Sequence, residues 1–203
     1  MILTVAGYKG GIAKTTTAVH LAAYLQASAP TLLVDGDANR SASLWASHKS
    51  LPFTVVPEAQ AMKHAREFEH IVIDTGARPS VDELRDLAGG CDLLVLPTSP
   101  ETMSLDALLQ TTEALRGIGG TYRVLLTLVP PSPSREAVEA RTLLEADGLP
   151  VMRSSIRQTV AFRHASAQGV PVYALKGQRS AKLAWLDYDR AAKEIVAAVG
   201  SGA

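Results

Sequence analysis

Residues 2–16 read ILTVAGYKGGIAKTT: a short apolar run, a loop with glycines and lysines, and a Lys-Thr pair that opens the next segment. Strand, glycine-rich loop and helix in this order are typical of a phosphate-binding loop, because loop N–H groups and a helix N-terminus point at phosphate oxygens. The usual G-x-x-x-x-G-K-[ST] spacing would place glycines at Tyr8 and Ala13. We expect an α-like backbone beside the helix start to accommodate the Ala13 methyl group, so the loop still predicts a nucleotide site.

Each polar residue of this loop has an expected role. Lys14 should reach the β- and γ-phosphates of the nucleotide, and the Thr15 hydroxyl should take a coordination position on Mg²⁺. An ordinary glycine-rich turn is the alternative, but strand, glycines, Lys-Thr pair and helix together disfavour it. The predicted nucleotide contacts here are Gly10, Gly11, Ile12, Ala13, Lys14, Thr15 and Thr16.

The rest of the chain alternates short apolar runs with helix-like segments. Nearly continuous apolar strands suit a parallel sheet covered on both faces, so the alternation predicts a doubly wound, mostly parallel α/β fold. With 203 residues and no linker, we expect one domain over 1–203. Expected strands are 2–6, 31–35, 53–56, 70–74, 92–97 and 122–129, and expected helices are 15–28, 80–89, 102–117, 134–147, 157–168 and 180–198.

Aspartates stand at the ends of two other predicted strands. Asp35 and Asp37 end the run at 31–35, and Asp74 ends the run at 70–74. Strand-end carboxylates facing a phosphate loop can act on Mg²⁺ or orient an attacking water, whereas an isolated one is more often a turn or helix cap. The phosphate loop favours the site role for Asp37 and Asp74. For Asp35 the sequence leaves two roles open: contact with the metal through a water, or a structural role.

Composition excludes several classes of protein. The single cysteine, Cys91, excludes an internal disulfide and a cysteine-ligated cluster built within one chain. No signal peptide or apolar stretch of roughly 20 residues is present, which favours a cytoplasmic location. The 20 basic and 20 acidic residues balance, but residues 151–190 hold seven Lys and Arg against two Asp, a local charge of +5.

Four segments together resemble the ParA/MinD family of deviant Walker-type ATPases, particularly the short ParA-type partition ATPases. The hallmark K-G-G-x-x-K-[ST] occurs as Lys9 to Thr15. LLVDGDANRSAS (32–43), HIVIDTGARPS (70–80) and DLLVLPTSPE (92–101) resemble further family segments. The resemblance implies a P-loop NTPase fold, ATP and Mg²⁺ as cofactors, and hydrolysis of ATP to ADP and phosphate.

The resemblance also implies residue roles. Lys9 resembles the lysine that reaches the partner's phosphates across a nucleotide-sandwich homodimer, Asp37 the residue that positions the hydrolytic water, and Asp74 the carboxylate that acts on Mg²⁺ through a water. In TLVPPSPS (127–134), Thr127, Pro130 and Pro131 fall where relatives contact adenine. Ala38-Asn39 and Gly76-Ala77 replace the family's Pro-Gln and Pro-Pro, which leaves the hydrolysis rate open.

The basic segment resembles the part of ParA proteins that binds DNA without sequence preference in the ATP-bound dimer. Arginine and lysine contacts to phosphates supply such salt-sensitive affinity. For any single residue, a solvated helix face is the alternative. We predict DNA contacts at Arg157, Arg163, Arg179 and Lys182, with Arg153 and Lys176 behind them.

The leading function is therefore an ATP-dependent positioning switch on the nucleoid. A ParB-like or cargo-adaptor activator would stimulate its ATP hydrolysis and release it from the nucleoid. Its cargo could be a plasmid, a chromosome or a protein assembly such as a carboxysome. No helix-turn-helix precedes the loop, so we do not expect operator-specific binding. A MinD-like, membrane-associated division regulator is one alternative, disfavoured by the small, weakly basic tail AAKEIVAAVGSGA at 191–203. A metabolic P-loop ligase or kinase is another, and Lys9 argues against it.

Overall fold

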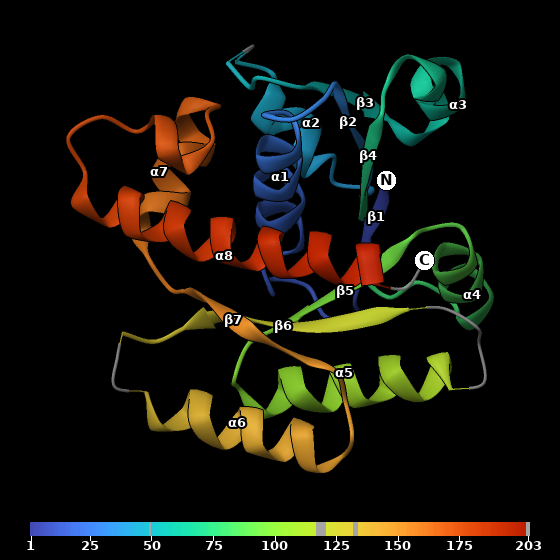
Figure 1. Ribbon diagram of the computed structural model, residues 1–203, viewed down its shortest axis with the longest axis vertical. Helices are drawn as coiled ribbons and strands as arrows, with labels where there is room; N and C mark the ends of the chain where they lie inside the picture. Colours follow the sequence, from blue (N-terminus) through green and yellow to red (C-terminus); the bar gives the residue numbers. More distant parts are fainter. Residues whose placement is uncertain (49, 117–120, 132–133, 202–203) are drawn as a thin grey trace.

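Seven strands form a single sheet in the order β3-β2-β4-β1-β5-β6-β7 (Figure 1). The computed structural model describes residues 1–48, 50–116, 121–131 and 134–201. Every neighbouring pair in this sheet is parallel. The strands are β1 (Ile2–Val5), β2 (Thr31–Gly36), β3 (Thr54–Pro57), β4 (His70–Thr75), β5 (Leu93–Thr98), β6 (Tyr122–Val129) and β7 (Val151–Arg157).

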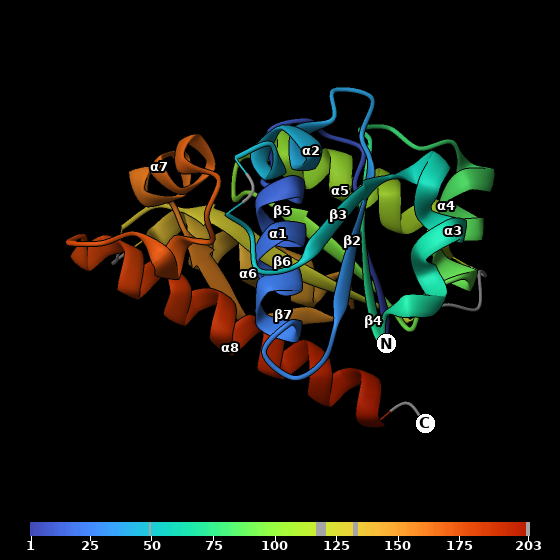
Figure 2. The same ribbon diagram turned by 90° about the horizontal axis from the view of Figure 1, so that it is seen from above.

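Helices cover both faces of the sheet (Figures 1 and 2). Successive strand residues point to opposite faces, so Val95 joins the core under one set of helices while Leu94 and Leu96 join the core under the other. The first set is α1 (Lys14–Leu25), α2 (Ser41–Ala46), α7 (Val160–Gln168) and α8 (Arg179–Ser201). The second set is α4 (Val81–Gly89), α5 (Thr102–Leu115) and α6 (Arg135–Ala146), and α3 (Ala61–His64) lies beside the β2–β3 edge.

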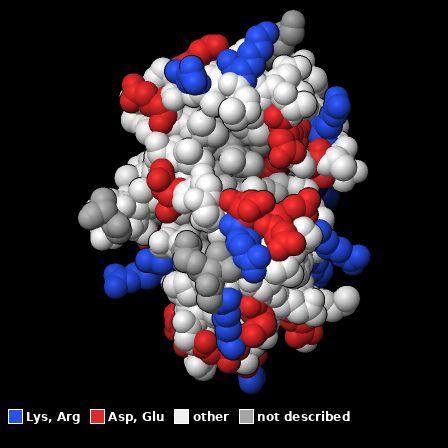
Figure 3. Space-filling view, turned by 90° about the vertical axis from the view of Figure 1, so that its right-hand side faces the viewer, with Lys and Arg blue, Asp and Glu red and all other residues white. Residues whose placement is uncertain are grey.

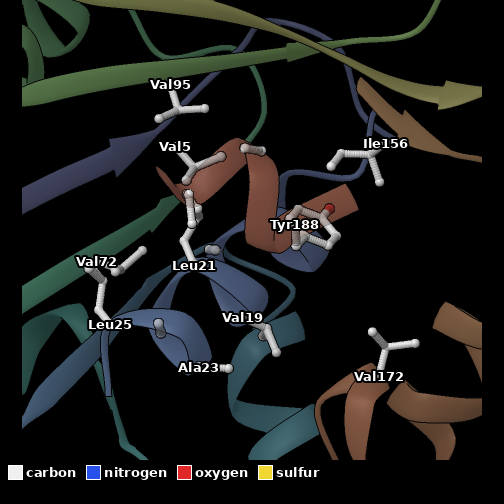
Figure 4. Close-up of a cluster of buried hydrophobic side chains, with 14 of the residues drawn as sticks. Val5, Val19, Leu21, Ala23, Leu25, Val72, Val95, Ile156, Val172 and Tyr188 are labelled. Carbon is white, nitrogen blue, oxygen red and sulfur yellow. The ribbon is translucent and has the colours of Figure 1, made fainter. Parts of the chain in front are cut away.

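The core on the α1 side joins distant parts of the chain. Figure 4 shows side chains of one buried cluster. Tyr188 of α8, Ile156 of β7 and Val172 lie in the same cluster as Leu21 of α1. Val172 begins a short 3₁₀ turn, Val172–Ala174, that lies between α7 and α8. The C-terminal third of the chain is therefore packed directly against the helix that follows the first loop.

The strand order creates a switch point at β1. From β1 the chain passes to β2 on one side, returns through β4, and then continues to β5 on the other side of β1. In open parallel sheets, ligands bind at such a crevice beyond the carboxyl ends of the strands. The loop after β1, the Asp37 segment after β2 and Asp74 of β4 all lie at this edge.

The predicted fold class is confirmed, and the six predicted strands are all present within one or two residues. The sequence did not predict α2, α3 or β7. The prediction that a helix begins at residue 157 was wrong, because Arg157 ends β7 and α7 begins at Val160. β7 reads VMRSSIR, and its polar centre hides the strand pattern. Residue 117, predicted as the end of a helix, lies outside the described residues.

The outer edge of β7 is covered by α8. The carboxylate of Glu194 accepts hydrogen bonds from the backbone N–H groups of Arg153 (2.7 Å) and Ser154 (3.0 Å). Unpaired strand edges invite pairing with other chains, and a carboxylate that occupies the donors removes that opportunity.

In the part of the chain that the structure describes, no helix is both long and apolar enough to cross a membrane.

Candidate functional site

The phosphate loop differs from expectation at Ala13. Its φ and ψ are 66° and 29°, which is the left-handed region and not the right-handed helical conformation that would suit a methyl group. The expectation of a relaxed Ala13 was therefore wrong, and the residue holds a glycine-like geometry without being glycine. Gly11, with φ of 77°, supplies the other left-handed position of the loop.

Strained backbone gathers at the same edge of the sheet. Among the described residues, the non-glycine positions with positive φ are Ala13, Arg40, Arg78 and Leu128. Ala13 follows β1, Arg40 follows β2, Arg78 follows β4, and Leu128 is the penultimate residue of β6. Such conformations persist where the surrounding structure imposes them, and they cluster at ligand sites.

Thr127 supports the loop from below. Its side chain is fully buried, and its hydroxyl lies 3.0 Å from the carbonyl oxygen of Ile12 and 3.1 Å from that of Thr98. The Thr127 hydroxyl therefore links β6 to the phosphate loop and to β5, and among the described residues Thr127 does not line the cavity. Its role as an adenine contact stays a prediction. Gly7 leaves little room beside the loop, because a Cβ at that position would lie 3.0 Å from the end of the Ile12 side chain.

Lys14 lies between charged groups at the bottom of the loop. It is only 9% exposed, and its ammonium group donates a hydrogen bond of 2.9 Å to the carbonyl oxygen of Lys9. Burial lowers the pKa of Lys14, while the carboxylates of Asp74 and Asp37 act in the opposite direction and favour its charged form. The expected phosphate-binding cation is thus close to both predicted carboxylates.

The Lys9 side chain contacts the start of α5. Its ammonium group donates to the hydroxyl of Ser104 (2.8 Å) and lies 3.3 Å from the carboxylate of Glu101. The lysine expected to act on a partner's nucleotide is therefore bound to its own chain in this structure. Only 28% of its side chain is exposed.

The two aspartates after β2 have different surroundings. Asp35 accepts hydrogen bonds from the Asp37 N–H (3.2 Å) and the Ser43 N–H (2.7 Å), so its carboxylate fixes the turn and the start of α2. This engagement favours the structural role over the metal role that the sequence left open. Asp37 lines the cavity described below and accepts from Asn39 N–H (3.2 Å) and Ser41 hydroxyl (3.2 Å). Those partners hold the Asp37 carboxylate at the loop.

Asp74 is the strongest candidate for action on a cation. It is fully buried, and neither carboxylate oxygen has a hydrogen-bond partner among the described residues. Burial raises the pKa of Asp74 to about 7, an effect reduced by the nearby Thr15 hydroxyl and Lys14 ammonium group. A buried carboxylate with two free oxygens beside a threonine hydroxyl fits Mg²⁺, which prefers oxygen ligands and retains several waters. Among the described residues, no group of three or more His, Cys, Asp or Glu side chains could hold a metal ion.

Lys14, Thr15 and Asp37 line a large cavity of about 910 Å³. Its lining includes Asp37 and the loop residues Gly10, Gly11, Ala13, Lys14, Thr15 and Thr16. The lining also includes Pro131, which was predicted as a nucleotide contact, and Trp45 and the Arg157–Val160 segment, which were not predicted in that role. Recognition of β7 as a strand would have identified this segment, because its carboxyl end lies at the same edge. Pro130 does not line the cavity among the residues described.

The residues predicted to contact DNA are divided between two environments. Arg163, Arg179 and Lys182 are exposed on α7 and the start of α8, at the left of Figure 1. Figure 3 shows the opposite, right-hand face, where acidic side chains gather near the centre among scattered basic ones. Arg157 instead donates 2.7 Å from Nη2 to Asp187, whose side chain is 8% exposed. This ion pair commits Arg157 to the β7–α8 packing, and it argues against Arg157 as a free phosphate contact.

The sequence profile of the family described as CobQ/CobB/MinD/ParA nucleotide binding domain matches residues 3–172. This chain belongs to that family. The family match confirms the ParA/MinD resemblance inferred from Lys9 to Thr15 and the three later segments. The matched residues include all of the sheet except Ile2 of β1, and all residues that line the cavity except Tyr188.

One relative is similar to this chain along nearly its whole length. Maintenance of carboxysome distribution protein A from Gloeobacter kilaueensis is 36% identical over 202 residues, which span 96% of this chain and 93% of that protein. Two solved structures share the fold. A McdA–ATP complex from Cyanothece has a TM-score of 0.75 at 18% identity and covers 98% of this chain and 96% of its own. MinD with Mg-ADP from Pyrococcus horikoshii has a TM-score of 0.72 at 19% identity, covering 100% and 98%.

Proposed function

We propose that this protein is a Mg²⁺-dependent ATPase that positions a cargo on the nucleoid. One observation carries the enzymatic part of this proposal. Lys14 at the start of α1, Asp37 after β2 and Asp74 in β4 lie close enough for both carboxylates to act on the charge of Lys14, and Lys14 and Asp37 line a large cavity. Phosphoryl transfer depends mainly on positioning and electrostatic stabilisation, which this set of groups can supply.

Each group has a proposed role in hydrolysis. Loop N–H groups and Lys14 bind the phosphates, and Asp37 orients the attacking water. Thr15 and Asp74 hold Mg²⁺, Asp74 through a water, and when bound the ion would neutralise charge on the phosphate oxygens. Lys9 acts on the nucleotide of a second copy, which requires that it leave Ser104 and Glu101.

One relative supports a proposal for the cargo, and exposed basic residues support a proposal for the DNA-binding surface. Because a relative with 36% identity is named for carboxysome distribution, we propose a protein assembly of that kind as cargo, and not a plasmid or chromosome. Arg163, Arg179 and Lys182 form the proposed DNA-binding surface, which two copies in an ATP-bound homodimer would double. An adaptor protein on the cargo then stimulates hydrolysis and releases the dimer from DNA.

A titration separates this function from a metabolic one. Binding to a nonspecific duplex is measured by fluorescence anisotropy with ATP, with ADP and without nucleotide, at 50 and 200 mM salt. ATP-dependent binding that weakens by about tenfold or more at the higher salt is the expected result. Equal binding in all three nucleotide conditions, or binding that salt does not affect, would refute the DNA-bound switch.

A further inference from the structure

A buried histidine connects the first turn of α1 to the segment between α7 and α8. Nδ1 of His20 lies 2.7 Å from the carbonyl oxygen of Thr16, and Nε2 lies 3.0 Å from the N–H of Val172. The Val172 N–H must donate, so Nε2 is unprotonated and the proton is on Nδ1. The ring is inaccessible to solvent and stacks on Tyr188 with centroids 4.7 Å apart and an interplanar angle of 12°. Burial lowers the pKa of His20 to about 4, so the ring is neutral and this bonding pattern is fixed.

A second connection starts from α2. Trp45 lines the cavity, and its indole N–H donates a hydrogen bond of 3.1 Å to the carbonyl oxygen of Val170. Trp45 also packs edge-on against His20, with ring centroids 5.8 Å apart. At Gly169 an added Cβ would lie 2.3 Å from the Cβ of His48, so the turn after α2 is in close contact with the end of α7. Residues 169, 170 and 172 are thus each held by an element that begins at the nucleotide site.

The held segment lies between the two helices that carry the proposed DNA contacts. α7 ends at Gln168 and carries Arg163, while α8 begins at Arg179 and carries Lys182. On the other side, Thr16 lines the cavity one residue after the proposed Mg²⁺ ligand, and α2 follows Asp37 by only a few residues. A shift of either element on nucleotide binding would therefore act on the backbone of Val170 and Val172.

We propose that His20 and Trp45 are positioning residues that couple the occupancy of the nucleotide cavity to the arrangement of α7 and α8, and thereby to DNA affinity. The inference rests on the proposed function for its DNA readout, but the coupling itself can be observed without DNA. Two well-packed connections to one short segment are suited to this role, because packed side chains and hydrogen bonds transmit discrete rearrangements.

The test uses two variants and two readouts. Trp45→Phe keeps an aromatic ring but removes the N–H that Val170 accepts, and His20→Asn shortens the side chain and breaks the link to Val172. Hydrogen exchange at the amides of Val170 and Val172 is compared with AMP-PNP, with ADP and without nucleotide, at saturating nucleotide measured for each protein. Duplex affinity with AMP-PNP is divided by duplex affinity with ADP.

In the unaltered protein, AMP-PNP is expected to slow exchange at these amides by at least threefold relative to ADP. Both variants should lose most of this difference, and their ratio of DNA affinities should fall by at least threefold. Met62→Ala is the control, because Met62 lies on α3, outside α7, α8 and the segment between them, and its side chain is 90% exposed. It should retain both responses.

Two outcomes would overturn the coupling: exchange at Val170 and Val172 that is insensitive to nucleotide in the unaltered protein, or full retention of that sensitivity in both variants. Failure of the DNA proposal is recognised separately. If the unaltered protein binds no DNA while its exchange still responds to nucleotide through His20 and Trp45, the DNA surface is wrong and the coupling stands.

Discussion

The ammonium group of Lys9 donates a hydrogen bond of 2.8 Å to the hydroxyl of Ser104, and this contact fixes the first loop lysine on the N-terminal turn of α5 of its own chain. Glu101 adds an exposed ion pair at 3.3 Å. In the proposed dimer, Lys9 must exchange both partners for the phosphates of the second copy. The contact therefore opposes dimer formation by a small free energy.

Release of Lys9 should favour the dimer. For Glu101→Gln combined with Ser104→Ala, we expect the dissociation constant of the ATP-bound dimer to fall by up to about tenfold, since the Lys9–Ser104 hydrogen bond and the exposed Lys9–Glu101 ion pair are lost from the monomer. The hydrogen bond from Ser99 to Ser104 is lost from the monomer and the dimer alike. Sedimentation with ATP and with ADP measures the change.

Lys9→Ala should have the opposite effect. We expect this variant to form a weaker ATP-bound dimer or to hydrolyse ATP more slowly, while nucleotide binding is largely retained. A dimer unaffected by all three substitutions would remove Lys9 from the interface.

Ala13→Gly should stabilise the protein. The left-handed backbone at Ala13 is strained for alanine and relaxed for glycine, so the free energy of unfolding should rise by about 1 kcal/mol. Urea denaturation without nucleotide measures it. Ala18→Gly is the matched control, because Ala18 lies inside α1 and its replacement should lower stability by about 1 kcal/mol or more. A loss of stability in Ala13→Gly would contradict the strain.

Asp37→Asn should separate binding from hydrolysis. The amide cannot act on water as the carboxylate does, so phosphate release should fall by about 100-fold while the ATP-bound dimer persists. Asp106→Asn, an exposed site on α5, serves as the control and should hydrolyse ATP at the unaltered rate. Rapid turnover in Asp37→Asn would exclude Asp37 from catalysis.

His20 should make stability depend on pH on the acid side. Its pKa is about 4 in the folded chain and about 6.5 when unfolded, so folding excludes a proton. Its contribution is complete above pH 6.5 and is lost as the pH falls toward 4, a loss of roughly 3 kcal/mol. His20→Asn should be less stable than the unaltered protein at pH 7, and this gap should shrink by roughly 2 kcal/mol at pH 4.5. Urea unfolding at both pH values measures it, and a constant gap would contradict the shift.

The sequence predicted the features that depend on local pattern. The apolar runs identified six strands, and their alternation with helices predicted the parallel sheet. Lys14, Thr15 and Asp74 could be linked in advance because the carboxyl ends of parallel strands meet at one edge. The same rule would have included the Arg157–Val160 segment if the polar centre of β7 had not concealed a strand.

Other features depend on contacts between distant residues. The ion pair of Arg157 with Asp187 joins residues 30 positions apart, and the hydroxyl of Thr127 supports Ile12 from 115 positions away. Neither pairing has a signature in spacing. The left-handed backbone at Ala13 also follows from the packing of the whole loop, since the intrinsic preference of alanine favours the opposite hand.

The carboxylate of Glu194 on the backbone of β7 has a consequence for how copies of this chain can assemble. Growth of a continuous sheet from one molecule to the next through this edge would have to displace a charged side chain from two N–H groups. Filaments built by strand addition at β7 are therefore disfavoured. A closed pair that opens and re-forms is compatible with that restriction, whereas an open-ended polymer through β7 is not.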